Sequence, residues 1–238
     1  QNNVFYDISG SGCGSVISFD VKNMLYEDNL AYDIGGTGVK DKDMGYMNTI
    51  RNNVIHDCID GIALTSQGGQ SGIEVNYNHV YNCSGLSIMF GANVPYINDI
   101  FVHHNTLLGT AKFSSILGSA NSYNINVFKN IIGNGKSQVY VVPLIKDTAT
   151  GRYRYVDYFP NSDTEKIQVD SNIVWSVASN IVGPGWGAPV VSWSNWATWG
   201  FDKNSILKQL ELDLNHTPIL PDSLKIYGCY GSDYNKVV

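Results

Sequence analysis

One short pattern recurs along this chain at nearly constant spacing. An alternating apolar segment is followed by an asparagine and then by a second apolar or aromatic segment, as in IEVNYNHVYNC at 73–83, TIRNNVIHDC at 49–58 and IFVHHNTLLG at 100–109. The recurring asparagines are Asn3, Asn29, Asn53, Asn78, Asn105, Asn130 and Asn172, with spacings of 26, 24, 25, 27, 25 and 42 residues. Self-similarity at such a period indicates a solenoid, in which each unit buries its apolar face only against its neighbours.

The repeated unit has the period of a β-strand. Ile73 and Val75, like Ile100 and Val102, alternate with polar residues, which places one face inward and the other outward. A helical repeat would need apolar residues three and four positions apart, and these segments lack them. We predict an all-β fold, a right-handed parallel β-helix of about seven coils, because parallel crossovers are almost always right-handed.

A coil of about 25 residues has room for three short strands and three turns. Equivalent residues of successive coils then lie about 4.8 Å apart. We therefore expect the asparagines to form a column at one corner, each amide bonding along the stack.

Two segments divide the chain. Residues 1–176 are predicted to form the coils, with a long loop insertion at 135–166 where the asparagine spacing widens. Residues 177–238 are predicted to form a tryptophan-rich C-terminal cap with short helices and a final partial coil. Trp193, Trp196 and Trp199 are three residues apart before Gly200, which favours a short helix whose rings close the last coil or, alternatively, bind sugars. The segment at 205–213 reads as a second short helix or an irregular strand.

Composition excludes several functions. The formal charge is −6 and only 15% of residues are charged, which argues against a nucleic-acid partner. No apolar run approaches the 18 residues of a membrane span. The first coil starts abruptly at Gln1, so we expect upstream residues or another chain to cover it. Cys58 and Cys83 stand 25 residues apart at one coil position, and we favour stacked free thiols there over a disulfide.

The asparagine corner followed by a G-I-x-L strand, over residues 2–176, resembles the right-handed parallel β-helix of the pectate-lyase-like superfamily. The C-terminal phrases WSNWATWGFDKNS and HTPIL resemble the tails of secreted β-helix enzymes that act on glycans. This resemblance implies a secreted or cell-surface protein whose partner is a polysaccharide or oligosaccharide.

The layout V-K-x, N-T-I-R-N-N-x-I, G-I-x-L resembles that of chondroitinase B and alginate lyases. In those enzymes a lysine base works with an arginine on the next coil. Lys40 matches the lysine, whereas IALTSQ at 62–67 has Thr65 and Ser66 where the arginine is expected. Proton abstraction next to a uronate carboxylate requires such a base and a cation that neutralises the carboxylate.

Other charged residues are expected to project outward near Lys40. Glu27 and Arg51 occupy the same position on adjacent coils, where a surface ion pair is the alternative to catalysis. Asp41, Asp43 and Glu74 have three interpretations: a Ca²⁺ site, a pair of acids for glycoside hydrolysis, or a solvated turn. No cofactor is otherwise implied, and the sequence identifies no metal ligands with certainty.

Aromatic residues recur three positions after the asparagines, namely Tyr6, Tyr32, His56 and Tyr81. This column either offers rings to sugars or packs against a flanking segment. His103 projects outward two residues before Asn105, and strand alternation places His104 on the opposite face, so we expect that the two do not share a metal.

We expect a polysaccharide lyase or glycoside hydrolase that holds an extended glycan across the coils. The alternative is a non-catalytic β-helix module of a tail-spike, adhesin or filament that binds sugar or spaces other parts. The predicted catalytic residues are Lys40, Arg51, Asp41, Asp43 and Glu74. The predicted substrate-binding residues are Tyr32, His56, Tyr81 and His103.

Overall fold

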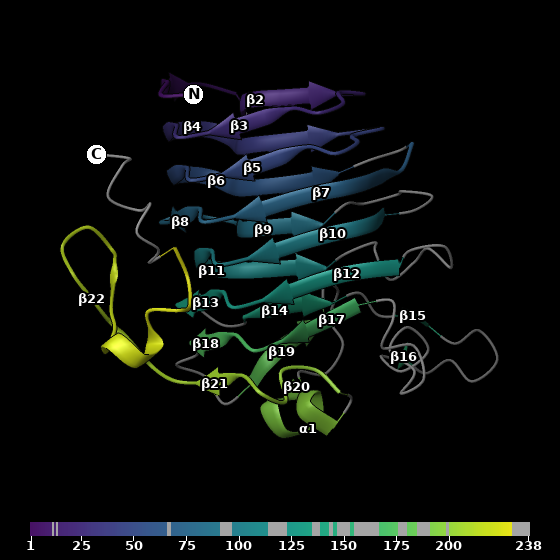
Figure 1. Ribbon diagram of the computed structural model, residues 1–238, viewed down its shortest axis with the longest axis vertical. Coiled ribbons are helices and arrows are strands. Elements are labelled where there is room, and N and C mark those ends of the chain that lie inside the picture. Colours follow the sequence, from purple (N-terminus) through teal and green to yellow (C-terminus); the bar gives the residue numbers. More distant parts are fainter. Residues whose placement is uncertain are drawn as a thin grey trace.

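The computed structural model is a parallel β-solenoid whose strands stack along one axis (Figure 1). It describes residues 1–10, 12, 14–65, 68–90, 97–113, 123–134, 139–142, 145–146, 153–154, 167–175, 180–184, 191–198 and 200–229. The predicted all-β parallel fold class is confirmed, but the solenoid has about four turns instead of about seven. The prediction of about seven coils came from the seven recurring asparagines.

Two parallel sheets form the walls of the solenoid. The six-stranded sheet contains, in spatial order, β3 (Leu25–Glu27), β5 (Thr49–Arg51), β7 (Gln70–Asn76), β10 (Ile97–His103), β12 (Tyr123–Phe128) and β17 (Ile167–Asp170). The 13-stranded sheet follows the order β1 (Val4–Ile8), β4 (Leu30–Lys42), β6 (Val54–Thr65), β8 (His79–Tyr81), β11 (Thr106–Phe113), β13 (Ile131–Asn134), β18 (Ile173–Trp175) and β21 (Ile206–Leu207). Its other members are β2 (Gly14–Phe19), β9 (Leu86–Phe90), β14 (Tyr140–Val142), β19 (Asn180–Pro184) and β20 (Val191–Ser192).

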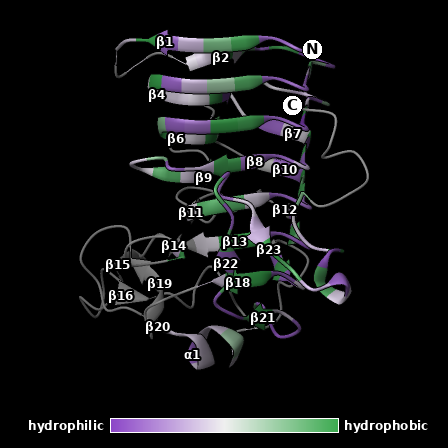
Figure 2. Ribbon diagram, turned by 90° about the vertical axis from the view of Figure 1, so that its left-hand side faces the viewer, coloured by the Kyte–Doolittle hydropathy of each residue, from purple (hydrophilic) through white to green (hydrophobic). Residues whose placement is uncertain are grey.

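The alternating apolar residues fill the interior, as the period-two pattern predicts. Ile73 pairs with Ile100, and Val75 with Val102, on neighbouring parallel strands. All four side chains are fully buried. Burial of such a side chain contributes about 1.5–3 kcal/mol, so the repeat itself provides one continuous core. Figure 2 shows the stacked strands from the side, with apolar and polar residues alternating along them.

The predicted asparagine column forms at the corner between the two sheets. Asn78 Oδ1, for example, accepts two hydrogen bonds from Asn53. One comes from the backbone N–H at 3.1 Å and the other from the side-chain amide at 2.9 Å. The Asn78 amide in turn donates to Asn105 Oδ1 at 2.9 Å and to the Ile50 carbonyl at 2.9 Å. The same pattern runs from Asn3 to Asn172. The corner carbonyls and amides are therefore paired along the stack although they are buried.

The residue just before each corner asparagine adopts a left-handed conformation. Tyr77, His104 and Lys129 have φ angles of 54°, 53° and 54°. Non-glycine residues enter this region at a cost of about 1–2 kcal/mol, which the hydrogen bonds of the column offset. This backbone reversal ends the period-two alternation of the strand and reorients the side chain at that position.

The C-terminal segment closes the far end of the solenoid. The predicted short helix is α1 (Trp193–Thr198), and the Gly200 N–H bonds to the Ala197 carbonyl after it. Trp196 is fully buried, stacks on Phe201 and donates from Nε1 to Asp202 at 2.8 Å. The interpretation in which tryptophans close the last coil thus holds for Trp196. Trp186 and Trp199 lie outside the described residues.

Asp202 and Ser205 terminate the asparagine column. Asn172 donates its backbone N–H to Ser205 Oγ at 2.7 Å and its amide to Asp202 Oδ1 at 3.1 Å. The Asp202 carboxylate is 1% exposed, and burial raises its pKa to about 6. The last asparagine therefore has partners although no further asparagine follows it.

Residues 205–213, predicted to form a short helix or an irregular strand, contain two short strands, β21 and β22 (Glu211–Leu212). After β21 come β22 and β23 (Pro218–Ile219), which pair antiparallel, and a 3-10 helix at Asp222–Leu224. Leu210 and Leu220 join Leu108 and Trp175 in a second apolar cluster outside the coils. None of the helices in the described ranges is long and apolar enough to cross a bilayer.

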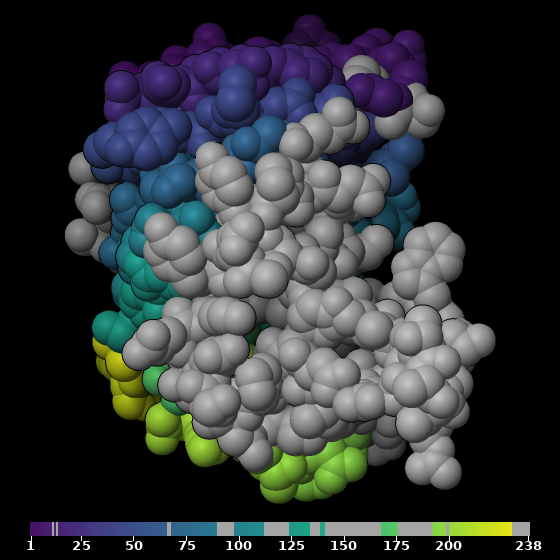
Figure 3. Space-filling model, turned by 90° about the vertical axis from the view of Figure 1, so that its right-hand side faces the viewer, coloured from purple at the N-terminus to yellow at the C-terminus, as the bar shows by residue number. Residues whose placement is uncertain are grey.

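Most of the insertion predicted at 135–166 lies outside the described residues, which include β15 (Ile145–Lys146) and β16 (Tyr153–Arg154), an antiparallel pair. Figure 3 shows this side of the molecule, with the first coils at one end and the segment around α1 at the other. The division of the chain at residue 176 stays a prediction.

Candidate functional site

The predicted catalytic residues do not gather in one place. Lys40 lies half-buried in β4, where it pairs with Ile17 and Ala63 in the 13-stranded sheet. Arg51 and Glu74 lie in the other sheet, on β5 and β7. The corner asparagines separate these two surfaces, so Lys40 and Arg51 belong to different faces of the solenoid.

Asp41 is inside the solenoid, which corrects the expectation of a solvated turn. Its carboxylate is fully buried and accepts hydrogen bonds from Ser18 Oγ at 2.7 Å and Asn48 Nδ2 at 3.0 Å. Burial raises its pKa, partly offset by the bonds from Asn48 and Ser18. The physical reason is alternation along β4: the fully buried Val39 and Asp41 point inward, and Lys40 between them does not.

The Ca²⁺ interpretation of Asp41, Asp43 and Glu74 gains no support from their positions. Asp41 is enclosed, and Glu74 projects from the six-stranded sheet. Within the described residues, no group of three or more histidine, cysteine or acidic side chains has the arrangement of a metal site.

Arg51 forms the ion pair that the repeat predicts. Its Nε lies 2.5 Å from Glu27 Oε2 on the adjacent coil, in register along β3 and β5. Glu27 is buried, whereas the Arg51 side chain is 44% exposed. The pair raises the pKa of the Arg51 guanidinium further. Neutralised by Glu27, Arg51 is poorly suited to bind an anionic substrate.

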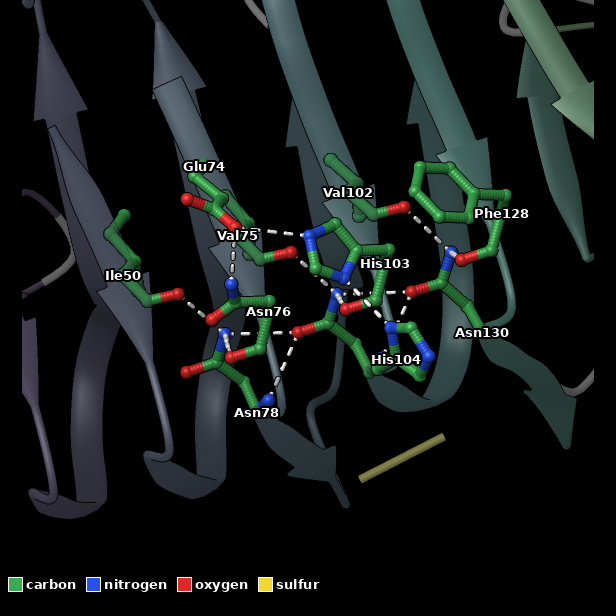
Figure 4. Close-up of polar contacts among 11 residues, drawn as sticks. Ile50, Glu74, Val75, Asn76, Asn78, Val102, His103, His104, Phe128 and Asn130 are labelled. Atoms are coloured by element: carbon green, nitrogen blue, oxygen red, sulfur yellow. Dashed lines mark hydrogen bonds and ion pairs between the residues drawn. The ribbon is translucent and has the colours of Figure 1, made fainter. Parts of the chain in front are cut away.

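His103 and His104 are hydrogen-bonded to each other, which corrects the expectation that they face opposite ways. Their Nδ1 atoms lie 2.8 Å apart, and Figure 4 shows both rings on the outer side of the sheet. His104 precedes Asn105 and has a φ of 53°. The left-handed backbone ends the alternation that a strand would impose.

Glu74 continues this chain of contacts on the neighbouring coil. Its Oε1 lies 3.0 Å from His103 Nε2 and also accepts a hydrogen bond from the Asn76 amide at 2.6 Å. Glu74, His103 and His104 thus form a continuous series, the relay cluster, across β7 and β10 (Figure 4). Twenty-nine residues separate Glu74 from His103, so only the stacking of coils joins them.

Two aromatic rings hold the histidines in place. Tyr77 stacks on His104 with centroids 5.1 Å apart, and Phe128 stacks on His103 at 5.0 Å. Both come from the coils on either side of β10. Such contacts contribute about 0.5–1.5 kcal/mol each and fix ring orientation. The relay cluster is therefore held rigidly although it lies on a surface.

Lys129 is a candidate-site residue that the sequence patterns above do not single out. It precedes Asn130 just as His104 precedes Asn105, and those asparagines bond directly, so the two residues occupy equivalent positions on adjacent coils. Among the described residues none forms an ion pair with Lys129. The sequence does contain a pattern that identifies this position, because the residue immediately before each recurring asparagine is His104 in one coil and Lys129 in the next.

A hollow of about 310 Å³ lies one coil beyond the relay cluster, on β12 and β17, and Phe128, which stacks on His103, is part of its lining. Lys129, Asp170 and Gln168 also contribute to the lining. The lining residues thus include an aromatic residue, a lysine, an aspartate and a glutamine. Burial, the charge of His103 and the charge of Lys129 together lower the pKa of His104 to about 4. His104 is therefore neutral at pH 7 beside a positive charge.

The predicted aromatic column forms on the other side of the corner. Tyr6, Tyr32, His56 and Tyr81 stack with successive centroid distances of 5.5, 5.3 and 4.7 Å and interplanar angles of 10° or less. His216 adds a fifth ring on Tyr81 at 4.9 Å. Because the rings cover one another's faces, Tyr32, His56 and Tyr81 present mainly their edges to solvent. The packing interpretation fits this geometry better than sugar stacking.

Cys58 and Cys83 are free thiols, as favoured from the sequence. Cys58 is 4% exposed and donates to the His56 carbonyl at 3.1 Å. Hydrogen bonding between the two thiols lowers the pKa of Cys58 and raises that of Cys83. Cys13 and Ser66 lie outside the described residues.

Comparison of the chain with protein-family models, with curated proteins and with solved structures finds no match. The geometry of the outer surfaces is therefore the basis for assigning a function.

Proposed function

We propose that this protein binds an extended acidic polysaccharide along the outer face of the six-stranded sheet and cleaves it by β-elimination. His104 acts as the base, and Lys129 binds the uronate carboxylate. The observation that carries the proposal is that a neutral imidazole, His104, and an ammonium group, Lys129, occupy equivalent positions on neighbouring coils, with Lys129 among the residues that line a hollow. Membership of the pectate-lyase-like superfamily and a secreted or cell-surface location are parts of the same proposal.

The reaction needs a base and a cation together. The carboxylate next to the reacting carbon must be neutralised before the C–H bond is acidic enough to break. His104 Nε2 takes the proton from that carbon, a carbon–carbon double bond forms, and the glycosidic C–O bond breaks. The departing oxygen receives a proton from solvent. Lys129 supplies the positive charge, since Arg51 is already neutralised by Glu27.

An extended sheet face suits an extended ligand. Coils about 4.8 Å apart present a row of side chains along the solenoid axis. The row beside the corner changes from Glu27 and Arg51 to His103, Phe128 and Asp170. Phe128 offers a ring next to the hollow, and its polar neighbours offer hydrogen-bond partners for sugar hydroxyls.

The test is turnover on a panel of uronate-containing and neutral polysaccharides. Elimination produces new ultraviolet absorbance from unsaturated uronates, whereas hydrolysis produces reducing ends without it. His104→Ala is expected to lower turnover by about 10²–10⁴-fold, because it removes the base. His56→Ala is the matched control, since His56 is also an outer histidine but lies in the aromatic column.

Lys40, on β4 of the 13-stranded sheet, is the alternative candidate for the catalytic base. Lys40→Ala should leave turnover unchanged if the site lies at His104. A loss of turnover in Lys40→Ala with none in His104→Ala would move the active site to β4 and overturn the proposal.

The second candidate is a non-catalytic module that binds or displays glycans. Thr65 favours it, because this residue stands where the resemblance to chondroitinase B leads one to expect an arginine. Binding of a polysaccharide without any cleavage product across the panel would support this candidate instead.

A further inference from the structure

We propose that Glu74, His103 and His104 form a proton relay in which His104 accepts a proton at Nε2 and His103, held by Glu74, carries the resulting charge. The inference deepens the proposed function and rests on it for its catalytic meaning. Its structural content, namely which ring nitrogen holds which proton, can be tested without any substrate.

The hydrogen bonds fix the protonation of both rings. A carboxylate only accepts, so His103 Nε2 must donate to Glu74 Oε1 across their 3.0 Å contact. A neutral His103 then has its lone pair on Nδ1 and accepts from His104 Nδ1 across 2.8 Å. His104 consequently holds its hydrogen on Nδ1 and has a lone pair on Nε2. Figure 4 shows that nitrogen directed away from the relay cluster.

A proton taken up at the outer end moves the charge inward. When Nε2 of His104 forms its new N–H bond, the hydrogen on His104 Nδ1 transfers to Nδ1 of His103. His104 is again neutral, now with its hydrogen on Nε2, and His103 becomes an imidazolium facing Glu74. One proton enters and one positive charge appears, so the step balances. Loss of the proton from Nε2 to solvent reverses it.

The surrounding charges favour this final distribution. Lys129, on the coil after His104, opposes a positive charge on His104. Glu74, on the coil before His103, stabilises a positive charge on His103. Arg51 interacts with Glu74 from β5 but is paired with Glu27. Tyr77 and Phe128 contribute only uncharged rings.

The relay explains how His104 can act as a base. Its pKa of about 4 makes it a weak proton acceptor if the charge stays on its own ring. Transfer of the charge to His103 removes the repulsion with Lys129 and creates an ion pair with Glu74. Glu74 and His103 are therefore positioning residues that act through His104.

The direct test is nitrogen NMR of protein labelled with ¹⁵N-histidine. At neutral pH we expect His104 to show an unprotonated Nε2 and a protonated Nδ1, and His103 to show the reverse. A wild-type spectrum with the hydrogen of His104 on Nε2 overturns the relay, and this measurement needs no variant.

Glu74→Gln tests the role of the carboxylate, with Glu211→Gln as the control on an exposed strand far from the cluster. On a cleaved glycan, Glu74→Gln should lower kcat about 10- to 100-fold with little change in KM, and Glu211→Gln should change neither. An unchanged kcat in Glu74→Gln contradicts the relay.

The two proposals fail separately. If the tautomers are as expected but no glycan is cleaved, the relay stands and the lyase function falls. If glycans are cleaved but His104 holds its hydrogen on Nε2 and Glu74→Gln leaves kcat unchanged, the function stands and the relay falls.

Discussion

Two columns of side chains flank the same asparagine corner, and they behave differently. In the aromatic column of Tyr6, Tyr32, His56 and Tyr81, one kind of side chain recurs and each ring covers the next. On the other side, from Glu27 to Asp170, the residue type changes at almost every coil. Its contacts are local: Glu27 with Arg51, and Glu74 with His103.

The difference shows what repetition does in a solenoid. A side chain type that recurs on every coil stacks on the equivalent side chains of the neighbouring coils. Its ring faces are then buried by these contacts and cannot bind a ligand. A position that varies leaves groups of different charge side by side, and there proton transfer and ligand binding become chemically feasible. The aromatic column therefore stabilises the fold, and the relay cluster is the site for which we propose a function.

The largest effect is expected at the corner that both columns share. Asn78→Ala removes the acceptor for two groups of Asn53 and the donor to Asn105. Several buried polar groups lose their partners, so the free energy of unfolding should fall by about 3–5 kcal/mol. Urea unfolding measures this change. Asn215→Ala, on an exposed turn, should stay within about 0.5 kcal/mol. A loss below about 1 kcal/mol at Asn78 would mean that the column contributes little.

The end of the corner column should give the protein a pH dependence of the opposite sign from most carboxylates. The pKa of Asp202 is about 6 in the folded protein and about 3.9 when unfolded. The folded state therefore binds more protons between these values, and its stability falls as pH rises from about 4 to 6, by about 2–3 kcal/mol at most.

Asp202→Asn should remove this contribution. The quantity to compare is the change in unfolding free energy between pH 4 and pH 7, in wild type and variant. An equal change in both proteins contradicts the raised pKa of Asp202.

Tyr32→Ala should break the aromatic column at its centre. Tyr32 stacks on both Tyr6 and His56, so we expect the unfolding free energy to fall by about 1–3 kcal/mol. Tyr32→Phe keeps the ring and should be nearly neutral. Thermal unfolding of both variants measures this difference. A loss of stability in Tyr32→Ala alone indicates that stacking stabilises the fold, whereas no loss in either variant indicates that the ring makes no stabilising contact. Turnover on glycans should not change, and a selective loss of binding would return this column to the list of sugar-binding surfaces.

The smallest effect is expected at the Glu27–Arg51 pair. The Arg51 side chain is 44% exposed, and solvent screens such a pair, so the coupling energy between Arg51 and Glu27 should be about 0–1 kcal/mol. A double-mutant cycle with Glu27→Gln at low and high salt measures the coupling. A coupling that exceeds about 2 kcal/mol would show that this position is more than a surface ion pair.

Much of the fold could be predicted from the sequence, because the repeat contains both the corner positions and the strand alternation. The asparagine spacing predicted the corner column, and period-two alternation predicted that Ile73, Val75, Ile100 and Val102 are buried. The placement of Tyr32, His56 and Tyr81 in one stack followed from their constant distance to the asparagines. The number of turns did not follow from the number of asparagines.

The candidate site was harder to predict. Strand alternation predicts that His103 and His104 lie on opposite faces. The left-handed conformation of the residue before each asparagine, here His104, interrupts this alternation. Asp41 was grouped with exposed charges, although the alternation that placed Val39 inside also placed Asp41 inside. Lys129 is not part of any alternating segment or aromatic column, and only the stacking of the coils places it at the same corner position as His104.

The sequence by itself determined the stacked coils, since a side-chain pattern that repeats every 25 residues can bury its apolar face in only a few ways. Only the tertiary structure decided which unlike side chains meet. Glu74 and His103 are 29 residues apart along the chain, and their contact depends on register between coils, whereas the contact of His103 with His104 depends on the backbone reversal at the corner. Local sequence fixes the direction of a strand residue, whereas the neighbour across the coil is set by how many residues the intervening turns contain.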